Sequence, residues 1–312
     1  MLIKGFIEKN KGLYYAIITA AVSGISIFLN KFAVSEIKPP LYFTSLKNLI
    51  VSGLVLSMFL LMRKFKDLKK LNPKEIKYLL AIGIVGGSLP FYLYFEGLSR
   101  ISSINGALIH KTLVIWVAFL AIPFLKEKIS KLQILGVSML FLSNLIVGGF
   151  KGFEYSYGEL LVLIATLLWG IENIVAKKVL KSVDPDIVVF FRMGIGSLIL
   201  TTFTLLTVPG AVAKTLSLNF QQMFWIILTS LLLFMYVKNW YKALRYSSAI
   251  FVTSVLVFST LITNILSAIF VTHSWNFSLS FQSISILLGV LIFILNEKNR
   301  SSKVTLNTEL IN

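Results

Sequence analysis

The sequence predicts an all-α integral membrane protein with ten transmembrane helices, arranged as two inverted repeats of five helices each. The first observation is composition: 56% of the 312 residues are hydrophobic and 14% are charged, whereas soluble proteins average about 25% charged residues. The second is length, because apolar stretches of the roughly 20 residues that cross a bilayer follow one another almost throughout the chain. The third is an internal similarity at an offset of about 146 residues, which predicts two copies of one unit.

The apolar stretches place the helices individually. The connections between them are short, so the chain leaves no room for a sizeable soluble domain. Residues 1–12 lack a small-residue cleavage site after a short apolar core, and we interpret them as a cytoplasmic lead-in rather than a signal peptide. The expected spans cover residues 12–33, 41–62, 76–97, 102–124, 131–149, 158–177, 187–208, 220–241, 248–271 and 279–296.

Lysine and arginine are distributed unequally between the two predicted sides of the membrane. With the amino terminus inside, 22 of the 30 Lys and Arg residues lie in inside segments and 5 in outside segments. Because positively charged loops stay in the cytoplasm, we expect a multi-pass protein of the plasma (inner) membrane with both termini cytoplasmic. The same bias explains the net charge of +17, so nucleic acid is not an expected partner.

The internal similarity assigns residues 1–150 to a first five-helix repeat and residues 151–312 to a second repeat with a short cytoplasmic C-terminal tail. A unit of five spans crosses the membrane an odd number of times, so the second copy must be inverted. Inverted repeats with a substrate site between them near the midplane are a recurring transporter architecture. The matching pairs are Gly12 and Gly158, Ser23-Gly24 and Trp169-Gly170, Lys31 and Lys177, Pro39 and Pro185, Leu98 and Leu244, and, one residue out of step, Lys47 and Arg192.

Two stretches of the sequence contain a recognisable combination of residues. One has Trp169-Gly170, Lys177, Pro185 and Arg192, and the other has Leu-Lys-Glu-Lys-Ile-Ser at 125–130 with Gln133 and Gly136. With these residues the sequence resembles the EamA family of the drug/metabolite transporter superfamily, over essentially the whole chain in two copies. The resemblance implies ten helices, an inverted-repeat fold and movement of small metabolites such as amino acids.

The sequence also departs from the family pattern. The family's proline in the fourth span would fall near Ile115, and its repeat mate near Leu261. Glu127 keeps the family's acidic position, but its repeat mate is His273. Small multidrug exporters, distant relatives in the superfamily, are similar in using a glutamate in their first span, where this chain has no acid. That departure argues against a simple exporter of cationic drugs.

Three spans carry polar residues along one face. In the first span the residues lie at steps of three and four, and in the other two spans their spacing likewise keeps them on one side of a helix, so we expect these faces to line a central cavity. The alternative is that small polar residues serve close helix packing. The stripes are Tyr15, Thr19, Ser23, Ser26 and Asn30 in the first span; Thr166, Trp169, Gly170, Asn173 and Lys177 in the sixth; and Thr253, Thr260, Asn264 and Ser267 in the ninth.

Charged residues inside predicted spans are the sharpest functional candidates, since a charge at the bilayer centre costs roughly 2.5–3.5 kcal/mol on insertion scales. We expect Lys111 to meet a carboxylate or phosphate of the cargo; the alternatives are a structural pair with Glu172, or snorkelling towards an interface. Glu172 could gain and lose a proton during transport. Lys47 is a second cargo candidate, whereas its mate Arg192 is expected near a cytoplasmic end, at headgroups or a helix terminus.

Aromatic residues and one kink complete the pattern. We expect Trp169 and Tyr94 to lie beside the substrate, whereas Trp240-Tyr241 fits an interface belt. His110 lies on a different helical face from its neighbour Lys111 and is expected to serve packing. The third span carries a kink or hinge on one face, at Gly83, Gly87 and Pro90.

These observations define a predicted substrate site without catalytic residues, metal or cofactor. The chain has no cysteine and two histidines, and it lacks paired inward carboxylates and a Ser/His arrangement. It also lacks an ATP-binding motif, so the expected energy source is a gradient or none. The predicted substrate-binding residues are Lys111, Glu172, Trp169, Asn173, Ser26, Asn30, Asn264, Thr260, Lys47 and Tyr94.

Three classes of function remain open from the sequence. The leading hypothesis is a secondary transporter that moves a small anionic or zwitterionic, amino-acid-like metabolite by alternating access. The alternative is a proton-coupled exporter of cationic drugs or toxic compounds that uses Glu172. A membrane-embedded enzyme or lipid scramblase is the third. The expected partners are a small-molecule substrate and the lipid bilayer, with the protein a monomer or homodimer.

Overall fold

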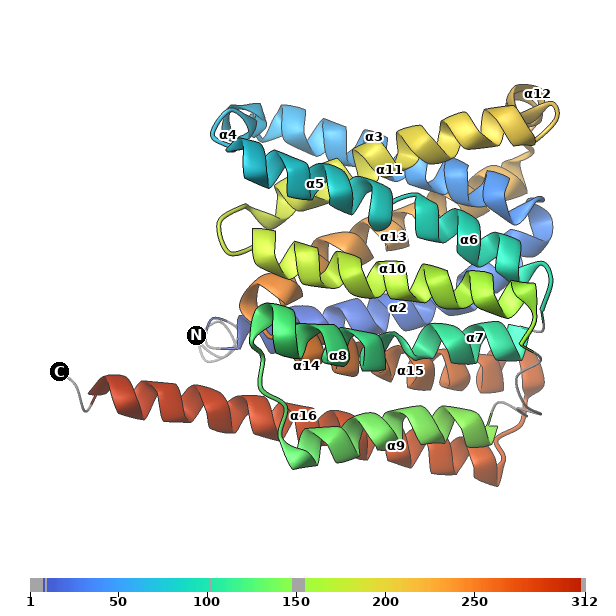
Figure 1. Ribbon diagram of the computed structural model, residues 1–312. Helices are drawn as coiled ribbons and strands as arrows, with labels where there is room; N and C mark the ends of the chain where they lie inside the picture. Colours follow the sequence, from blue (N-terminus) through green and yellow to red (C-terminus); the bar gives the residue numbers. More distant parts are fainter. Residues whose placement is uncertain (1–7, 9, 102, 148–154, 310–312) are drawn as a thin grey trace.

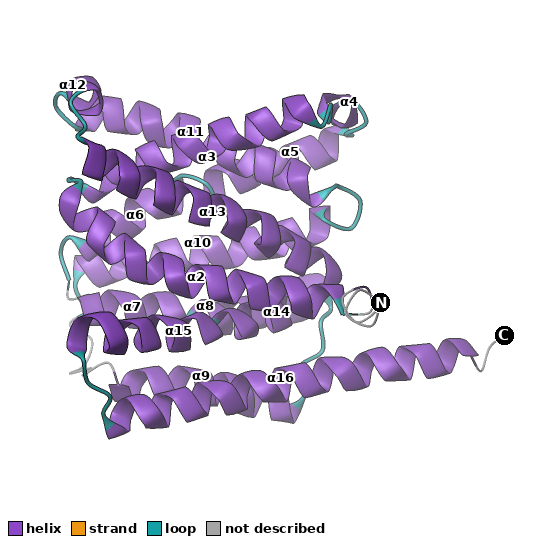
Figure 2. Ribbon diagram, turned by 180° about the vertical axis from the view of Figure 1, so that it is seen from behind, coloured by secondary structure: helices purple, strands orange, loops and turns teal. Residues whose placement is uncertain are grey.

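The computed structural model describes residues 8, 10–101, 103–147 and 155–309, and every regular element in that part is a helix. The helices lie side by side in one bundle, with α9 and α16 paired along one edge (Figures 1 and 2). The elements are α2 (Lys11–Glu36), α3 (Pro40–Leu61), α4 (Phe65–Leu68), α5 (Pro73–Val85), α6 (Leu89–Leu98), α7 (Ser103–Lys111), α8 (Leu113–Leu125), α9 (Lys131–Val147), α10 (Tyr157–Val179), α11 (Pro185–Thr207), α12 (Ala211–Leu216), α13 (Phe220–Tyr246), α14 (Ala249–Leu256), α15 (Phe258–Ser267), a π-helical turn (Ala268–Thr272) and α16 (Phe277–Glu309).

The predicted all-α membrane fold is confirmed. Within the described residues, nine helical segments are long and apolar enough to cross a bilayer. The predicted span at 131–149 corresponds to α9, which is a shorter apolar helix, and the last residues of that span lie outside the described part. The tenth crossing therefore stays a prediction.

The two repeats interlock. Helices that the sequence pairs as repeat mates run in opposite directions through the bundle, as α2 and α10 show (Figure 1). The first helix of each repeat packs against the third span of the other: α2 against α13, and α10 against α5 and α6. The second helices, α3 and α11, pack against each other. The repeat boundary predicted at residue 150 lies outside the described residues and stays a prediction.

Three predicted spans are interrupted. The third span is divided between Val85 and Leu89, where the sequence predicted a kink, because Pro90 has no backbone N–H and is tolerated only in the first turn of a helix. The fourth span is divided at Thr112 and the ninth at Val257, which correspond to within one residue in the two repeats. The counterpart of the third span, α13, is continuous. The first repeat therefore has an interruption that the second lacks.

Glycines allow the interrupted third span to touch α11. A Cβ atom on Gly83 would lie 2.7 Å from the Cβ of Ile195, and one on Gly87 would lie 2.4 Å from the carbonyl oxygen of Arg192. Such distances are shorter than any ordinary contact, so larger residues would push the helices apart. The backbones of the third and seventh spans therefore approach closely near the middle of the bundle.

An ion-pair cluster joins the connection after α3 to the start of α11. The ammonium of Lys64 pairs with the carboxylate of Asp186 and, at 3.4 Å, with that of Asp184. The Asp184 side chain also caps α11, accepting from the backbone N–H of Asp186 at 2.8 Å. Burial alone lowers the pKa of Lys64, but the two carboxylates outweigh it and hold that pKa above its ordinary value. Lys64 therefore stays charged at neutral pH.

We expect Lys64→Gln to destabilise the protein, because it leaves the Asp186 carboxylate, 10% exposed, without its cation. Such a loss costs on the order of 1–3 kcal/mol and should lower the melting temperature in detergent by several degrees. The matched control is Lys70→Gln, which breaks a pair with Asp67 whose side chains are 76% and 43% exposed. Exposed pairs contribute about 0–1 kcal/mol, so equal shifts for the two variants would contradict the prediction.

Candidate functional site

A buried polar cluster lies between three helices of the second repeat. Tyr241 of α13 is fully buried and donates its hydroxyl to Oε1 of Glu172, on α10, at 2.6 Å. Glu172 is 3% exposed. Arg192 of α11 interacts electrostatically with both side chains. A carboxylate taken out of water needs such hydrogen bonds and a nearby cation, and here they come from two other helices.

Residues around Glu172 fix its position against the third span. The indole N–H of Trp169, one turn earlier on α10, donates to the carbonyl oxygen of Gly86 at 3.3 Å. A Cβ atom on Gly86 would lie 2.4 Å from Cγ of Glu172. Asn173 donates to the carbonyl of Trp169 at 2.9 Å, and its own Oδ1 is buried without a hydrogen-bond partner in the described part of the chain. The carboxyl group therefore lies directly against the interruption between α5 and α6.

The structure corrects the expectation for Arg192. Instead of lying at an interface, this residue is 7% exposed. Its Nη1 lies 3.6 Å from the sulfur of Met193, and its guanidinium lies 5.9 Å from the ring centroid of Phe91. Its Nε has no hydrogen-bond partner among the described residues. The side chain cannot snorkel to the surface because neighbouring helices enclose it.

Four aromatic rings meet beside the cluster. The Trp169 ring lies 5.3 Å from Phe91, 5.5 Å from Tyr94 and 5.0 Å from His110, in edge-to-face geometry. The rings of Tyr94 and His110 are 5.3 Å apart. Trp169 and Tyr94 therefore lie together, and His110 packs against both; that they lie beside a substrate stays a prediction.

Lys111 is half-buried at the last residue of α7, next to the break at Thr112. A cation at a helix C-terminus is favoured by the carbonyl groups that end there. The sequence left open a structural pair between Lys111 and Glu172. The structure instead gives Glu172 a hydrogen bond from Tyr241 and Arg192 as its charged neighbour.

The first repeat carries a second, smaller polar cluster. The ammonium of Lys47, 9% exposed, donates to Oδ1 of Asn30 at 3.3 Å, and Asn30 donates to Ser26 at 3.0 Å. Lys47 also lies 5.1 Å from the ring centroid of Phe43. Lys47 and Ser26 are the repeat mates of Arg192 and Glu172, so the cation recurs in both repeats while the acid occurs in one.

The predicted ninth-span residues lie elsewhere. Asn264 of α15 donates to Gln282 of α16 at 2.5 Å, and the neighbouring Thr263 donates to the carbonyl of Gly24 at 2.9 Å. Thr260 is half-buried on the same helix. The structure therefore ties Asn264 to α16 and does not bring it into the cluster around Glu172.

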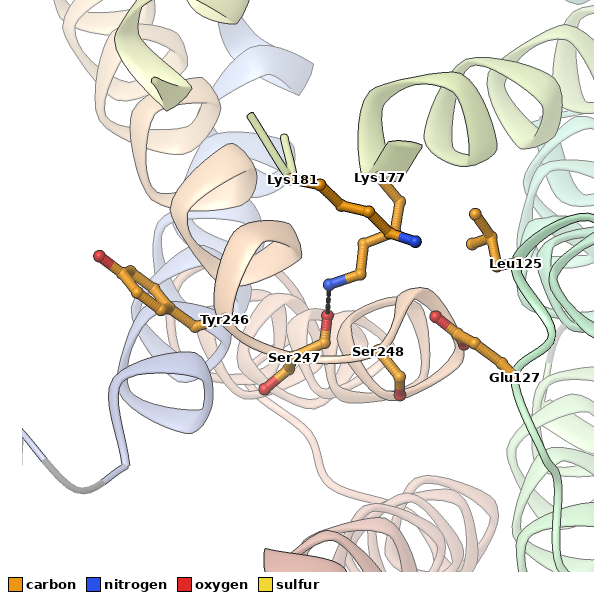
Figure 3. A pocket seen from close by; sticks show the side chains of 7 residues that line it. All are labelled: Leu125, Glu127, Lys177, Lys181, Tyr246, Ser247 and Ser248. Atoms are coloured by element: carbon orange, nitrogen blue, oxygen red, sulfur yellow. Dashed lines mark hydrogen bonds between the residues drawn. The ribbon is translucent and has the colours of Figure 1, made fainter. Parts of the chain in front are cut away.

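A pocket of about 270 Å³ opens at the end of the bundle where α13 joins α14 (Figure 3). Lys177 donates there to the carbonyl oxygens of Leu244 and Ser247 at 2.5 and 2.7 Å. Glu127 accepts from the backbone N–H groups of Ala249 and Ile250 at 2.7 and 3.2 Å. The two side chains satisfy helix ends, so this pocket holds a structural junction.

The comparisons with known proteins agree with this architecture. The model of the EamA-like transporter family matches residues 10–149 and again residues 156–295. The chain belongs to the EamA-like transporter family. The two matches begin 146 residues apart, as the internal similarity predicted, and they confirm the resemblance to this family of the drug/metabolite transporter superfamily.

Individual relatives show how similar this chain is to other proteins in sequence and in fold. An uncharacterized transporter, YyaM of Bacillus subtilis (strain 168), is 28% identical over 164 residues, which cover 50% of this chain and 53% of that protein. The chain thus spans about half the length of this curated relative. A solved crystal structure superposes with a TM-score of 0.72 over 90% of this chain and 98% of the other, at 13% identity. At that identity the likeness concerns the fold alone.

In this EamA-family chain, sequence reasoning missed Tyr241, Phe91 and Arg192 as members of the cluster. Trp240 and Tyr241 were expected in an interface belt, but they are 5% and 0% exposed. One signal was present for Arg192, since its repeat mate Lys47 was already a cargo candidate. No sequence pattern marked Tyr241, because the neighbours that this side chain faces are decided by how the helices pack.

We expect Tyr241→Phe to destabilise the protein by about 1–3 kcal/mol, because it leaves the buried Glu172 carboxylate without its hydroxyl donor. Thermal unfolding in detergent measures the effect. The matched control is Tyr246→Phe on the same helix, where the side chain is 50% exposed. If the two variants unfold at the same temperature, the hydrogen bond to Glu172 contributes nothing measurable.

Proposed function

We propose that this protein is a secondary transporter that moves a small anionic or zwitterionic, amino-acid-like metabolite by alternating access through a central cavity between the two repeats. The observation that carries the proposal is an excess of cations in the central part of the described spans. Lys47 and Arg192, which are 9% and 7% exposed, lie there with a single acid, Glu172. A charge inside a membrane protein needs a counter-charge, and an anionic group on the cargo supplies it.

The same cluster supports this function over export of cations. The carboxylate of Glu172 already accepts a hydrogen bond from Tyr241, and Arg192 is its charged neighbour. A cationic compound without an anionic group would meet the guanidinium with nothing to compensate the repulsion, and like charges in a low-dielectric site repel strongly. Transport, rather than catalysis, is also what the family and the curated relative are named for.

Flux into liposomes tests the proposed function. Purified protein should exchange labelled anionic or zwitterionic metabolites, and Lys111→Ala should reduce that exchange by about tenfold, which corresponds to one charge-assisted contact. Lys31→Ala serves as the control, because Lys31 is exposed at the end of α2. If only cationic compounds are moved, or none of these solutes, the proposal is wrong.

We also propose that the protein lies in the plasma membrane with the end that carries α4 in the cytoplasm, together with both termini. The absence of native cysteine allows single-cysteine labelling in intact cells. Lys214→Cys, exposed on α12 at the opposite end of the bundle, should react with a membrane-impermeant reagent. Lys69→Cys, exposed after α4, should react only after the cells are opened; the reverse pattern would invert the topology.

A further inference from the structure

The interruption of the third span leaves the start of α6 uncapped. The first N–H groups of a helix lack partners within the helix and carry positive potential. Ser88 occupies the N-cap position, but its side chain does not cap α6 and donates instead to the carbonyl of Ile84 at 3.0 Å. Pro90 has no N–H, so the amides of Leu89 and Phe91 are the first-turn donors of this ten-residue helix that the Ser88 side chain does not cap.

Arg192 lies beside this helix start. Its guanidinium is 5.9 Å from the ring centroid of Phe91, in the first turn of α6. Arg192 is only 7% exposed, yet its Nε has no hydrogen-bond partner among the described residues. Its Nη1 lies 3.6 Å from the sulfur of Met193, a weak acceptor, and the guanidinium also interacts with the hydroxyl of Tyr241. A planar guanidinium whose Nε donor is unused is suited to a carboxylate, which it binds through two parallel hydrogen bonds.

Glu172 lies on the other side of the same interruption. Gly86 touches Glu172, since a Cβ there would lie 2.4 Å from its Cγ, while Gly87 touches the backbone of Arg192. The hydrogen bond from Tyr241 engages Oε1 of the carboxylate, which leaves Oε2 as an acceptor. A positive and a negative group therefore border one short stretch of non-helical backbone.

We propose that the interruption between α5 and α6 is a two-charge binding site for a zwitterion. Arg192 and the first amides of α6 receive the cargo's carboxylate, and Glu172, positioned by Tyr241, receives its ammonium group. The inference rests on the proposed transport function and narrows the cargo to compounds that carry both groups close together, as an α-amino acid does. Its recognition elements are backbone amides and two side chains from α10 and α11.

The two repeats differ in the parts that this site needs. The repeat mate of Glu172 is Ser26, and the mate of Tyr241 is Phe95. The counterpart of the interrupted third span is α13, which is continuous over 27 residues. Only the cation recurs, as Lys47, and it is held by Asn30. The described part of the chain therefore contains one such site, and one zwitterion should bind per protein.

The test measures binding to the purified full-length protein by thermal shift, with L-α-amino acids as the probes. For each amino acid that raises the melting temperature, two derivatives are measured beside it. The N-acetyl derivative lacks the ammonium group and the carboxamide lacks the carboxylate. Because the site uses both groups, each derivative should bind about tenfold more weakly or worse, as expected for loss of a charge-assisted contact.

Two variants show which side chain binds which charged group of the amino acid. Arg192→Gln should bind the amino acid and its carboxamide equally while still rejecting the N-acetyl derivative. Glu172→Gln should bind the amino acid and its N-acetyl derivative equally while still rejecting the carboxamide. The matched controls are Arg245→Gln, exposed near the end of α13, and Glu96→Gln, which pairs with Arg100 on the surface; both should keep the native preferences.

The comparison of each amino acid with its two derivatives on the native protein tests the site even if a variant does not fold. Arg192→Lys and Glu172→Asp provide milder substitutions. An N-acetyl derivative or carboxamide that binds the native protein as tightly as its parent would overturn the two-charge site. So would native preferences that persist in folded Arg192→Gln and Glu172→Gln. In either case, flux of an anionic solute into liposomes would leave the proposed function standing, whereas absence of anionic and zwitterionic flux would overturn both.

Discussion

The packing of the surrounding helices depends on the hydrogen bond between Tyr241 and Glu172, with Arg192 beside it. Moving a carboxylate out of water costs several kcal/mol unless hydrogen bonds and a cation compensate. These partners come from α11 and α13 while Glu172 lies on α10, so the cluster is complete only when three helices of the second repeat meet in one arrangement. The polar centre therefore specifies the packing around it, and the packing in turn keeps water from the charges.

The glycines of the third span connect this centre to the other repeat. Gly86 and Gly87 let the first repeat's backbone touch Glu172 and the Arg192 carbonyl, which a side chain at either position would prevent. The interruption they permit frees amide groups that a continuous helix would use internally. Close packing and ligand recognition thus depend on the same short segment, and the interlocked repeats place it between α10 and α11.

The sequence predicted some members of the candidate site and missed others for a physical reason. Glu172 was found because an acid within an apolar stretch is conspicuous, and Trp169 because it belongs to a polar stripe with the helical period. Tyr241 was placed in an interface belt because hydropathy gives the depth of a residue in the membrane but not the neighbour it faces. Arg192 was placed at a surface because a long side chain can reach water from a helix end, but the packed helices close that route.

By itself, the sequence determined that the chain is a helical membrane protein built from two repeats, and it located the spans and the kink before Pro90. These properties are local, since they depend on the length, spacing and hydrophobicity of residues that are close in the chain. Only the tertiary structure decided which polar side chains meet: Glu172 with Tyr241 and Arg192, Lys47 with Asn30, and Asn264 with Gln282. Side chains on different helices are brought together by how those helices rotate and cross, and the residues along a single helix do not encode that choice.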